Sequence, residues 1–325
     1  MKEGELDVVH KPTEEGGGEM KIIECTGLTK IYGRKKALDQ MTFSIEENKI
    51  TGLIGRNGAG KTTLLKILAG FMKETSGEIK VFSERPFNSL NVSANSVFVD
   101  DQMSFPQAIP LGEILEVARD FYPNWDHTLA LRLFDYFSFD PRDYHKRLSK
   151  GKTSTFNMII GLASRAPLTI FDEPTTGMDA SVRKDFYRAL LKDYIAHPRT
   201  IIISSHHLDE IEDLLEDVLL IKNGKKHMHI AISDMKEWAI GIKGPAAEVL
   251  DLMNGRDVIY KNEIGIKTLY AVVKNDLAES ILNQAQAAGL EISSVRSSDL
   301  CVYLTNDTKG GIDDVFNQNE SSRNR

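Results

Sequence analysis

Residues 55–63 carry the glycines, lysine and threonines of a phosphate-binding loop. The stretch Gly-Arg-Asn-Gly-Ala-Gly-Lys-Thr fits the pattern G-x-x-x-x-G-K-[ST]. Glycines let backbone N–H groups wrap a phosphate chain, which a Cβ would obstruct. Lys61 can reach the β- and γ-phosphates, and the Thr62 hydroxyl can ligate Mg²⁺. The predicted nucleotide-binding residues of this loop are Gly55, Arg56, Asn57, Gly58, Ala59, Gly60, Lys61, Thr62 and Thr63.

Two adjacent carboxylates, Asp172 and Glu173, follow the apolar run Leu168–Phe171. A buried strand there would deliver Asp172 to the edge of the nucleotide pocket, where it can hold Mg²⁺. Glu173 can accept a proton from the attacking water as general base. No guanine-reading N/T-K-x-D segment follows a suitable strand, which argues against a GTPase. Together these signals favour an ATPase that uses ATP and Mg²⁺.

Short apolar runs alternate with segments of helical periodicity. This alternation predicts an α/β fold with a parallel sheet that helices cover on both faces. The expected strands are Ile50–Ile54, Leu168–Phe171 and Thr200–Ser204. The expected helices are Lys61–Gly70, Leu111–Arg119, Thr128–Phe137 and Val182–Ile195. A buried strand before the phosphate loop and a helix after it are the context that such a loop requires.

The composition changes near residue 230, which separates an ATPase domain (20–230) from an accessory or regulatory domain (231–308). The second domain has the order strand–helix–strand–strand–helix–strand, which is the order of a ferredoxin-like sandwich. Its last part, Glu291–Leu304, is expected to be a pair of strands. Residues 1–19 are acidic with a glycine run and residues 309–325 are polar, so both are expected to be disordered tails.

Further motifs, in a family's order, make residues 22–230 resemble the ATP-binding subunit of an ABC transporter. An aromatic residue, Tyr32, precedes the phosphate loop. Leu-Ser-Lys-Gly-Lys (148–152) resembles the LSGGQ signature. Gly-Met-Asp (177–179) resembles the D-loop, and the segment 201–206 resembles the switch strand. The resemblance implies a P-loop ATPase of the ABC type with a helical subdomain at about 103–165.

The resemblance also implies roles for single residues. Tyr32 would stack on adenine, and Asp179 would lie at the dimer interface with the second subunit. Ser149 and Gly151 would meet the γ-phosphate that the opposite subunit holds. His206 would sense the γ-phosphate, whereas its neighbour His207 is expected to be a bystander.

Two parts of the sequence depart from the family pattern. In the signature, Lys150 replaces a glycine and Lys152 replaces the glutamine. Lys150 can either add charge near the opposite phosphate or lower the efficiency of closure. After the strand Val97–Val99, counting places Asp101 where the family has a glutamine that contacts Mg²⁺ and the membrane partner, with Gln102 one residue later. Either side chain can ligate Mg²⁺, and we assign Gln102.

The resemblance implies that two ATPase subunits, either two copies or one copy with a homologue, close head to tail around two ATP molecules. They would drive a separate integral membrane permease. The stretch Phe-Tyr-Pro-Asn-Trp-Asp (121–126) resembles one in bacterial drug- and peptide-export subunits, including bacitracin-type systems. Export of a drug, peptide or antibiotic is therefore the favoured function. The alternative is a non-transport ABC ATPase, either ribosome-associated or acting in DNA maintenance.

The composition restricts the partners and the setting. The chain has 40 Lys and Arg against 47 Asp and Glu, a formal charge of −7, so general capture of nucleic acid is not expected. Two distant cysteines, Cys25 and Cys301, predict reduced thiols and no structural zinc. No apolar run approaches the ~20 residues of a membrane helix. We expect a cytoplasmic protein, peripheral on the inner face of the cell membrane through its permease.

Overall fold

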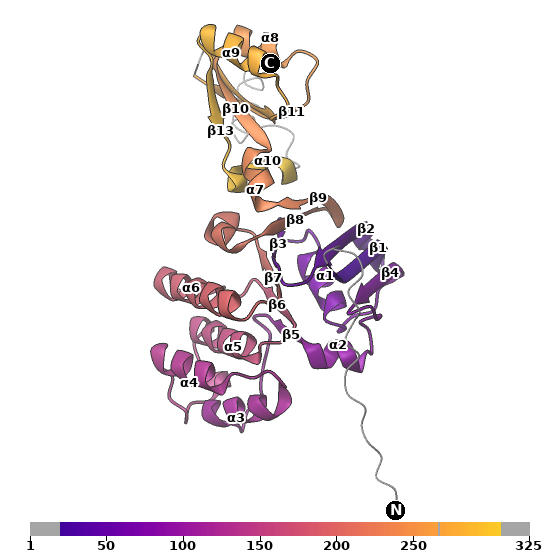
Figure 1. Cartoon of the computed structure of the whole chain (residues 1–325), viewed down its shortest axis with the longest axis vertical. Coiled ribbons are helices and arrows are strands. Elements are labelled where there is room, and N and C mark those ends of the chain that lie inside the picture. The colour runs from indigo at the N-terminus through magenta and orange to yellow at the C-terminus, as the bar shows by residue number, and fades with distance from the viewer. Residues whose placement is uncertain (1–19, 266, 307–325) are drawn as a thin grey trace, which may run out of the picture.

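A six-stranded sheet forms the centre of the structure, a computed structural model that describes residues 20–265 and 267–306 (Figure 1). The two expected disordered tails, 1–19 and 309–325, lie outside the described residues. The strand order is β5-β6-β7-β3-β8-β9, and every neighbouring pair is parallel except β8 and β9. The strands are β3 (Ile50–Ile54), β5 (Ser96–Val99), β6 (Leu168–Asp172), β7 (Thr200–Ser205), β8 (Asp217–Lys222) and β9 (Lys225–Ala231). The expected parallel α/β sheet and its three predicted strands are therefore confirmed.

A second, antiparallel sheet was not foreseen from the sequence. Its order is β2-β1-β4. The strands are β1 (Lys21–Tyr32), β2 (Lys35–Glu46) and β4 (Ser76–Val81). Buried and exposed residues alternate along much of β1 and β2, as in a sheet with one solvated face. Helix α1 (Lys61–Leu68) packs its leucines between the two sheets, with Leu28 and Leu38 on one side and Ile202 on the other.

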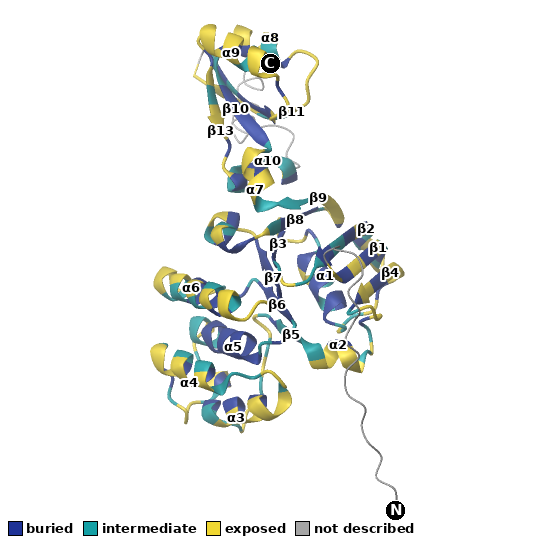
Figure 2. Cartoon of the chain, viewed as in Figure 1, coloured by how far each residue is buried: buried dark blue, intermediate teal, exposed yellow. Residues whose placement is uncertain are grey.

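Helices α3 (Leu111–Phe121), α4 (His127–Tyr136) and α5 (Lys150–Ser164) make up the helical subdomain, and the first two confirm the predicted helices. Helix α5 is buried along most of its length, between the subdomain and the sheet (Figure 2). Helix α6 (Ala180–Ala196) confirms the helix predicted between β6 and β7.

The aromatic stretch 121–126 forms the turn between α3 and α4. Asp126 caps α4 by accepting the Leu129 N–H at 2.8 Å. Its other carboxylate oxygen lies 2.7 Å from Arg165 Nη2, and the same Arg165 nitrogen lies 2.9 Å from Asp193 on α6. The turn thus attaches the outer helices of the subdomain to α6.

The C-terminal part is a four-stranded antiparallel sheet with helices, at the opposite end of the molecule from α3 and α4 (Figure 1). Its strand order is β11-β12-β10-β13. The strands are β10 (Ala239–Pro245), β11 (Val258–Ile264), β12 (Thr268–Lys274) and β13 (Glu291–Ser294). The helices are α7 (Ile232–Glu237), α8 (Ala246–Met253), α9 (Glu279–Ala287) and α10 (Ser297–Thr305). The predicted order of the first six elements is present.

The expected strand pair over Glu291–Leu304 is wrong, because only β13 is a strand and the rest is α10. The apolar residues 300–304 are consecutive, but the buried residues Ser297, Leu300, Cys301 and Thr305 recur at helical spacing. Leu300 and Cys301 join the same hydrophobic cluster as Leu208 and Val218 of the ATPase part. Helix α10 therefore returns from the C-terminal sheet to the central sheet.

Within residues 20–265 and 267–306, no helix is both long enough and apolar enough to cross a bilayer.

Candidate functional site

The phosphate loop lies at the carboxyl edge of the central sheet. Strands β3, β6 and β7 run parallel and end together, with Ile54 opposite Ser205 and Asp172 opposite Ser204. Ligands of open parallel sheets bind at this edge. Gly60 has φ +110°, and a Cβ there would lie 2.6 Å from the Ala37 carbonyl oxygen. A glycine is required at this position for the loop to enter α1.

A pocket of about 260 Å³ opens over this loop. It is lined by Tyr32, Lys35, Ala37, Arg56, Asn57, Gly58, Gly60, Lys61, Thr62, Thr63 and Glu173. The N-terminus of α1 adds backbone N–H groups and the positive end of its dipole. Tyr32 is half exposed, and its hydroxyl lies 2.7 Å from Met72 Sδ. Lys35 and Ala37 both belong to the start of β2, and the sequence motifs did not indicate them.

The Lys61 side chain is buried in the pocket, and its ammonium has two partners. Its ammonium donates to the Gly55 carbonyl oxygen at 2.6 Å and lies 3.1 Å from Glu173 Oε1. The second contact is an ion pair without hydrogen-bond geometry, because Glu173 Oε1 has no hydrogen-bond partner in the described structure. The other carboxylate oxygen lies 2.7 Å from His206 Nδ1. The structure thus brings together the predicted phosphate lysine, general base and switch histidine.

Ser204 binds the carboxylate of Asp172 and the backbone of Glu173, and this role was missed from the sequence. Its hydroxyl donates to Asp172 Oδ1 at 2.5 Å and accepts the Glu173 backbone N–H at 2.9 Å. Glu173 has φ +47°, a left-handed conformation that is rare for a residue with a side chain. The available signal was a hydroxyl at the end of the isoleucine run of β7, next to the strand that carries the carboxylates.

His207 lies beside the network without joining it in the described structure. Its ring is 4.0 Å from that of His206, and its backbone N–H donates to Ser205 Oγ at 2.9 Å. This placement agrees with its expected role as a bystander.

The signature and D-loop residues form a second cluster outside the pocket lining. Ser149 caps α5, because its hydroxyl accepts the Lys152 N–H at 3.4 Å. A Cβ on Gly151 would lie 2.5 Å from the Gly177 carbonyl oxygen, so this glycine allows the two loops to touch. Asp179 caps α6, and its hydrogen bonds from the Val182 N–H and from Ser181 lower the pKa of its carboxyl.

The predicted metal ligand Gln102 is exposed in the loop after β5 and is not among the pocket-lining residues described. Its backbone N–H donates to Asp100 Oδ1 at 3.1 Å. Burial raises the pKa of Asp100 despite this hydrogen bond. The described side chains contain no cluster of three or more metal-ligating groups. Of the other two predicted metal ligands, Thr62 lines the pocket and Asp172 is buried at the end of β6.

Sequence comparison places this geometry in a family. The sequence model of the ABC transporter family matches residues 38–176. An uncharacterised ABC transporter ATP-binding protein of Methanocaldococcus jannaschii is 30% identical over 262 residues, which cover 80% of this chain and 93% of that protein. The chain belongs to the ABC transporter ATP-binding proteins. It is therefore an ABC ATPase, an enzyme that couples ATP hydrolysis to transport.

Other relatives and solved structures agree with this ABC ATPase fold. The bacitracin transport ATP-binding protein of Bacillus licheniformis is 30% identical over 66% of this chain and 72% of its own length. The solved ATP-binding subunit of an ABC transporter superposes with a TM-score of 0.59 at 22% identity, over 66% of this chain and 92% of that one. A dimeric ATP-binding cassette in a post-hydrolysis state with ADP and Pi gives 0.57 at 19% identity, over 65% and 98%.

Proposed function

We propose that this ABC ATPase is the motor subunit of an exporter, and that two subunits close head to tail around two ATP molecules to drive a separate membrane permease. One observation carries the proposal. Lys61 and Glu173 line one pocket and Glu173 contacts His206, whereas the signature residues Ser149 and Gly151 are neither among the described lining residues nor in this network. Each chain then supplies half of a site, and a partner chain supplies the other half.

The residues in and around the pocket have separate roles in binding ATP and in hydrolysing it. Backbone N–H groups of the phosphate loop and the Lys61 ammonium bind the phosphates, and Tyr32 stacks on adenine at the mouth. Glu173 accepts the proton of a water whose oxygen attacks the γ-phosphorus, while the bond from that phosphorus to the β,γ-bridging oxygen breaks and ADP leaves. His206 orients the Glu173 carboxylate and contacts the γ-phosphate. The partner's signature, with Ser149, Gly151 and the nearby Asp179, closes over that phosphate.

The donor set of this pocket fits Mg²⁺. Mg²⁺ is bound by one or two carboxylates together with substrate phosphates and waters, and it needs no dedicated protein cage. Asp172 supplies a buried carboxylate, and Thr62 supplies a hydroxyl in the phosphate pocket. Gln102 is the third assigned ligand and would have to approach from the loop after β5. When bound, the ion would neutralise phosphate charge.

The permease would dock beside that same loop. Phe71 and Leu90 are exposed by 66% and 87%, unusual values for large apolar side chains, and Phe71 packs edge-on against Phe98 of β5. A permease loop that covers them would bring the enzyme to the inner face of the cell membrane. We propose a drug, peptide or antibiotic as the cargo of the exporter. This cargo class rests on similarity to the bacitracin transport protein and to the Nod factor export protein I of Ralstonia nicotianae, which is 27% identical over 66% of this chain.

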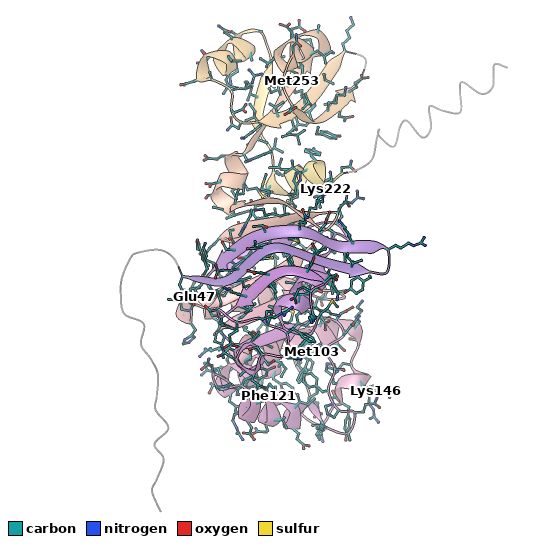
Figure 3. The ribbon with its side chains drawn as sticks, turned by 90° about the vertical axis from the view of Figure 1, so that its right-hand side faces the viewer. Glu47, Met103, Phe121, Lys146, Lys222 and Met253 are labelled. Atoms are coloured by element: carbon teal, nitrogen blue, oxygen red, sulfur yellow. The ribbon has the colours of Figure 1, made fainter. Side chains whose placement is uncertain are left out.

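The C-terminal part, 231–308, is proposed to be a regulatory domain of the ferredoxin-like type. Helix α10 carries the connection, because both of its ends contact the ATPase part. Near its start, Ser297 donates to Glu212 at 3.0 Å, just after the switch histidine segment. At its end, Asn306 lies 3.5 Å from Arg56 of the phosphate loop, and Lys222 donates to the Leu304 carbonyl oxygen at 3.1 Å. Figure 3 shows Lys222 at the junction with the C-terminal sheet.

The split site is tested by the dependence of ATPase activity on protein concentration. Hydrolysis by the purified full chain should rise more steeply than linearly until the dimer saturates. Lys61→Ala should abolish the activity at every concentration. A strictly linear dependence in the wild-type chain would contradict the shared site.

The permease surface is tested by membrane recovery. Leu90→Asp should reduce co-purification with an integral membrane partner and leave the basal ATPase activity of the isolated chain unchanged. The matched control is Ile195→Asp, which changes an apolar residue that is 69% exposed near the end of α6. Equal recovery of both variants would count against this docking surface.

A further inference from the structure

The two lysines in the signature lie where a helix disfavours cations. Lys150 and Lys152 both lie in the first turn of α5, and this turn has no acidic residue. The N-terminus of a helix carries about half a positive charge, so a cation there is destabilising unless it finds a negative partner. Lys150 and Lys152 each contact a different negative partner.

Lys152 is bound inside the helical subdomain. Its ammonium donates to the carbonyl oxygens of Phe137 and Ser138 at 2.6 and 2.9 Å, and lies 4.5 Å from the centre of the Phe139 ring. Phe137 caps the C-terminal end of α4, where the helix dipole is negative. This lysine therefore links α5 to α4, which is a structural role.

Lys150 has a different environment. Its stem lies against the D-loop, because a Cβ on Gly177 would be only 3.0 Å from Lys150 Cγ. Its ammonium is 3.9 Å from Asp101 Oδ2, and both side chains are about half exposed. Asp101 stands where the family has its glutamine. Two departures from the family pattern, of opposite charge, thus lie side by side.

The loop that carries Asp101 is also anchored to α5 at a second point. Asn157, two turns after the signature, is buried and donates to the carbonyl oxygens of Asp100 and Met103 at 3.3 and 3.2 Å. His145 fixes the Asn157 amide at 2.7 Å. Asn157 is therefore hydrogen-bonded to the loop on both sides of Asp101. Lys150, at the start of the same helix, lies close to the Asp101 carboxylate itself.

We infer that Lys150 and Asp101 form a positioning pair, which makes the loop after β5 and the signature move as one unit. Asp101 belongs to the loop beside which the permease is proposed to dock, and Lys150 lies against the D-loop, so the pair would transmit closure from the permease to the signature. This inference rests on the proposed function, because a signature meets a γ-phosphate only in a head-to-tail dimer. Lys150 acts here through Asp101 rather than on the opposite phosphate.

Charge reversal in the full-length chain tests the pair. We expect Lys150→Glu and Asp101→Lys each to lower kcat by about threefold or more, with an unchanged KM for ATP, because neither residue lines the pocket. The double variant K150E/D101K restores the opposite charges and should recover kcat to within about twofold of the wild type. Direct contact of Lys150 with the opposite phosphate predicts the contrary, a double variant at least as impaired as K150E.

Two controls separate this pair from a general effect of charge. Lys146→Glu and Asp120→Lys make the same charge changes at exposed sites of the same subdomain, and both should leave kcat within twofold of the wild type. Melting temperatures confirm that all variants fold, and the neutral pair K150Q/D101N provides a second comparison, expected between wild type and K150E. Additive losses in the double variant would overturn the pair alone. Strictly linear activity of the wild-type chain would overturn both the pair and the proposed dimer.

Discussion

Glu173 has two partners, and replacing it with glutamine separates its role as a base from its role as a negative charge. Lys61 and His206 contact its two carboxylate oxygens at 3.1 and 2.7 Å. Glu173→Gln keeps the shape and removes the charge and the basicity. Loss of a positioned general base should lower the hydrolysis rate by about 10²- to 10⁴-fold. Loss of the negative charge should strengthen ATP binding, because Lys61 no longer has a rival for the phosphates.

The gain in affinity follows from the geometry. Two unit charges 3.1 Å apart attract by about 5 kcal/mol at an effective dielectric constant of 20. The Glu173 side chain is 26% exposed, and Lys61 keeps its bond to Gly55, so solvent screening leaves a net competition of about 1–2 kcal/mol. We therefore expect a five- to thirtyfold lower Kd for a non-hydrolysable ATP analogue, by the relation between free energy and Kd.

Titration calorimetry with the analogue measures the affinity, and phosphate release with ATP measures hydrolysis. His207→Gln is the matched control, because its ring lies beside His206 and has no described contact with Glu173. It should leave both quantities near wild type. Wild-type hydrolysis by E173Q would refute Glu173 as the base. An unchanged or higher Kd would refute the competition between Glu173 and phosphate for Lys61.

Three further changes probe the same edge of the sheet. Lys61→Ala removes a charge-assisted phosphate contact and should raise the Kd for ATP about tenfold or more, measured by calorimetry. Ser204→Ala leaves Asp172 and the Glu173 N–H without their shared partner, and should cost about 1–3 kcal/mol of unfolding free energy in a denaturant titration, where no loss would contradict the bridge. Asp100→Asn should raise the melting temperature at pH 7, because burial raises the pKa of this carboxyl and so disfavours its charged form. The folded chain binds that proton more tightly than the unfolded chain. Wild-type stability therefore falls as the pH rises from about 4 through the raised pKa, and the gain from D100N should disappear below pH 4.

The sequence alone predicted the elements whose residues are buried in a continuous run or repeat with a helical period. Strands β3, β6 and β7 are buried at every position, and their runs of isoleucine, leucine and phenylalanine are unmistakable. The ligand edge followed from them, because parallel strands end together and the phosphate loop had to follow β3. Lys61, Glu173 and His206 were assigned to one site from their motifs and from the resemblance to the ABC family, and the structure brings their side chains into contact.

Other features depend on contacts between segments that are distant in the chain. The β2-β1-β4 sheet is half buried, so its strands carry many polar residues and do not stand out as apolar runs. Helix α10 is short, and its helical period could be separated from strand alternation only by knowing that Leu300 and Cys301 face the central sheet. Ser204 could not be assigned from one strand alone, because its partners lie on the neighbouring strand.

The contacts of Glu173 also suggest how ATP could activate the base. The Glu173 carboxylate contacts Lys61 through one oxygen and His206 through the other. We expect a bound γ-phosphate to compete with Glu173 for the Lys61 ammonium, because both are anions, and so to make the carboxylate a better acceptor for the proton of water. The ion pair that is expected to weaken ATP binding would thus also make release of the base depend on the γ-phosphate, before the partner's signature closes over the site.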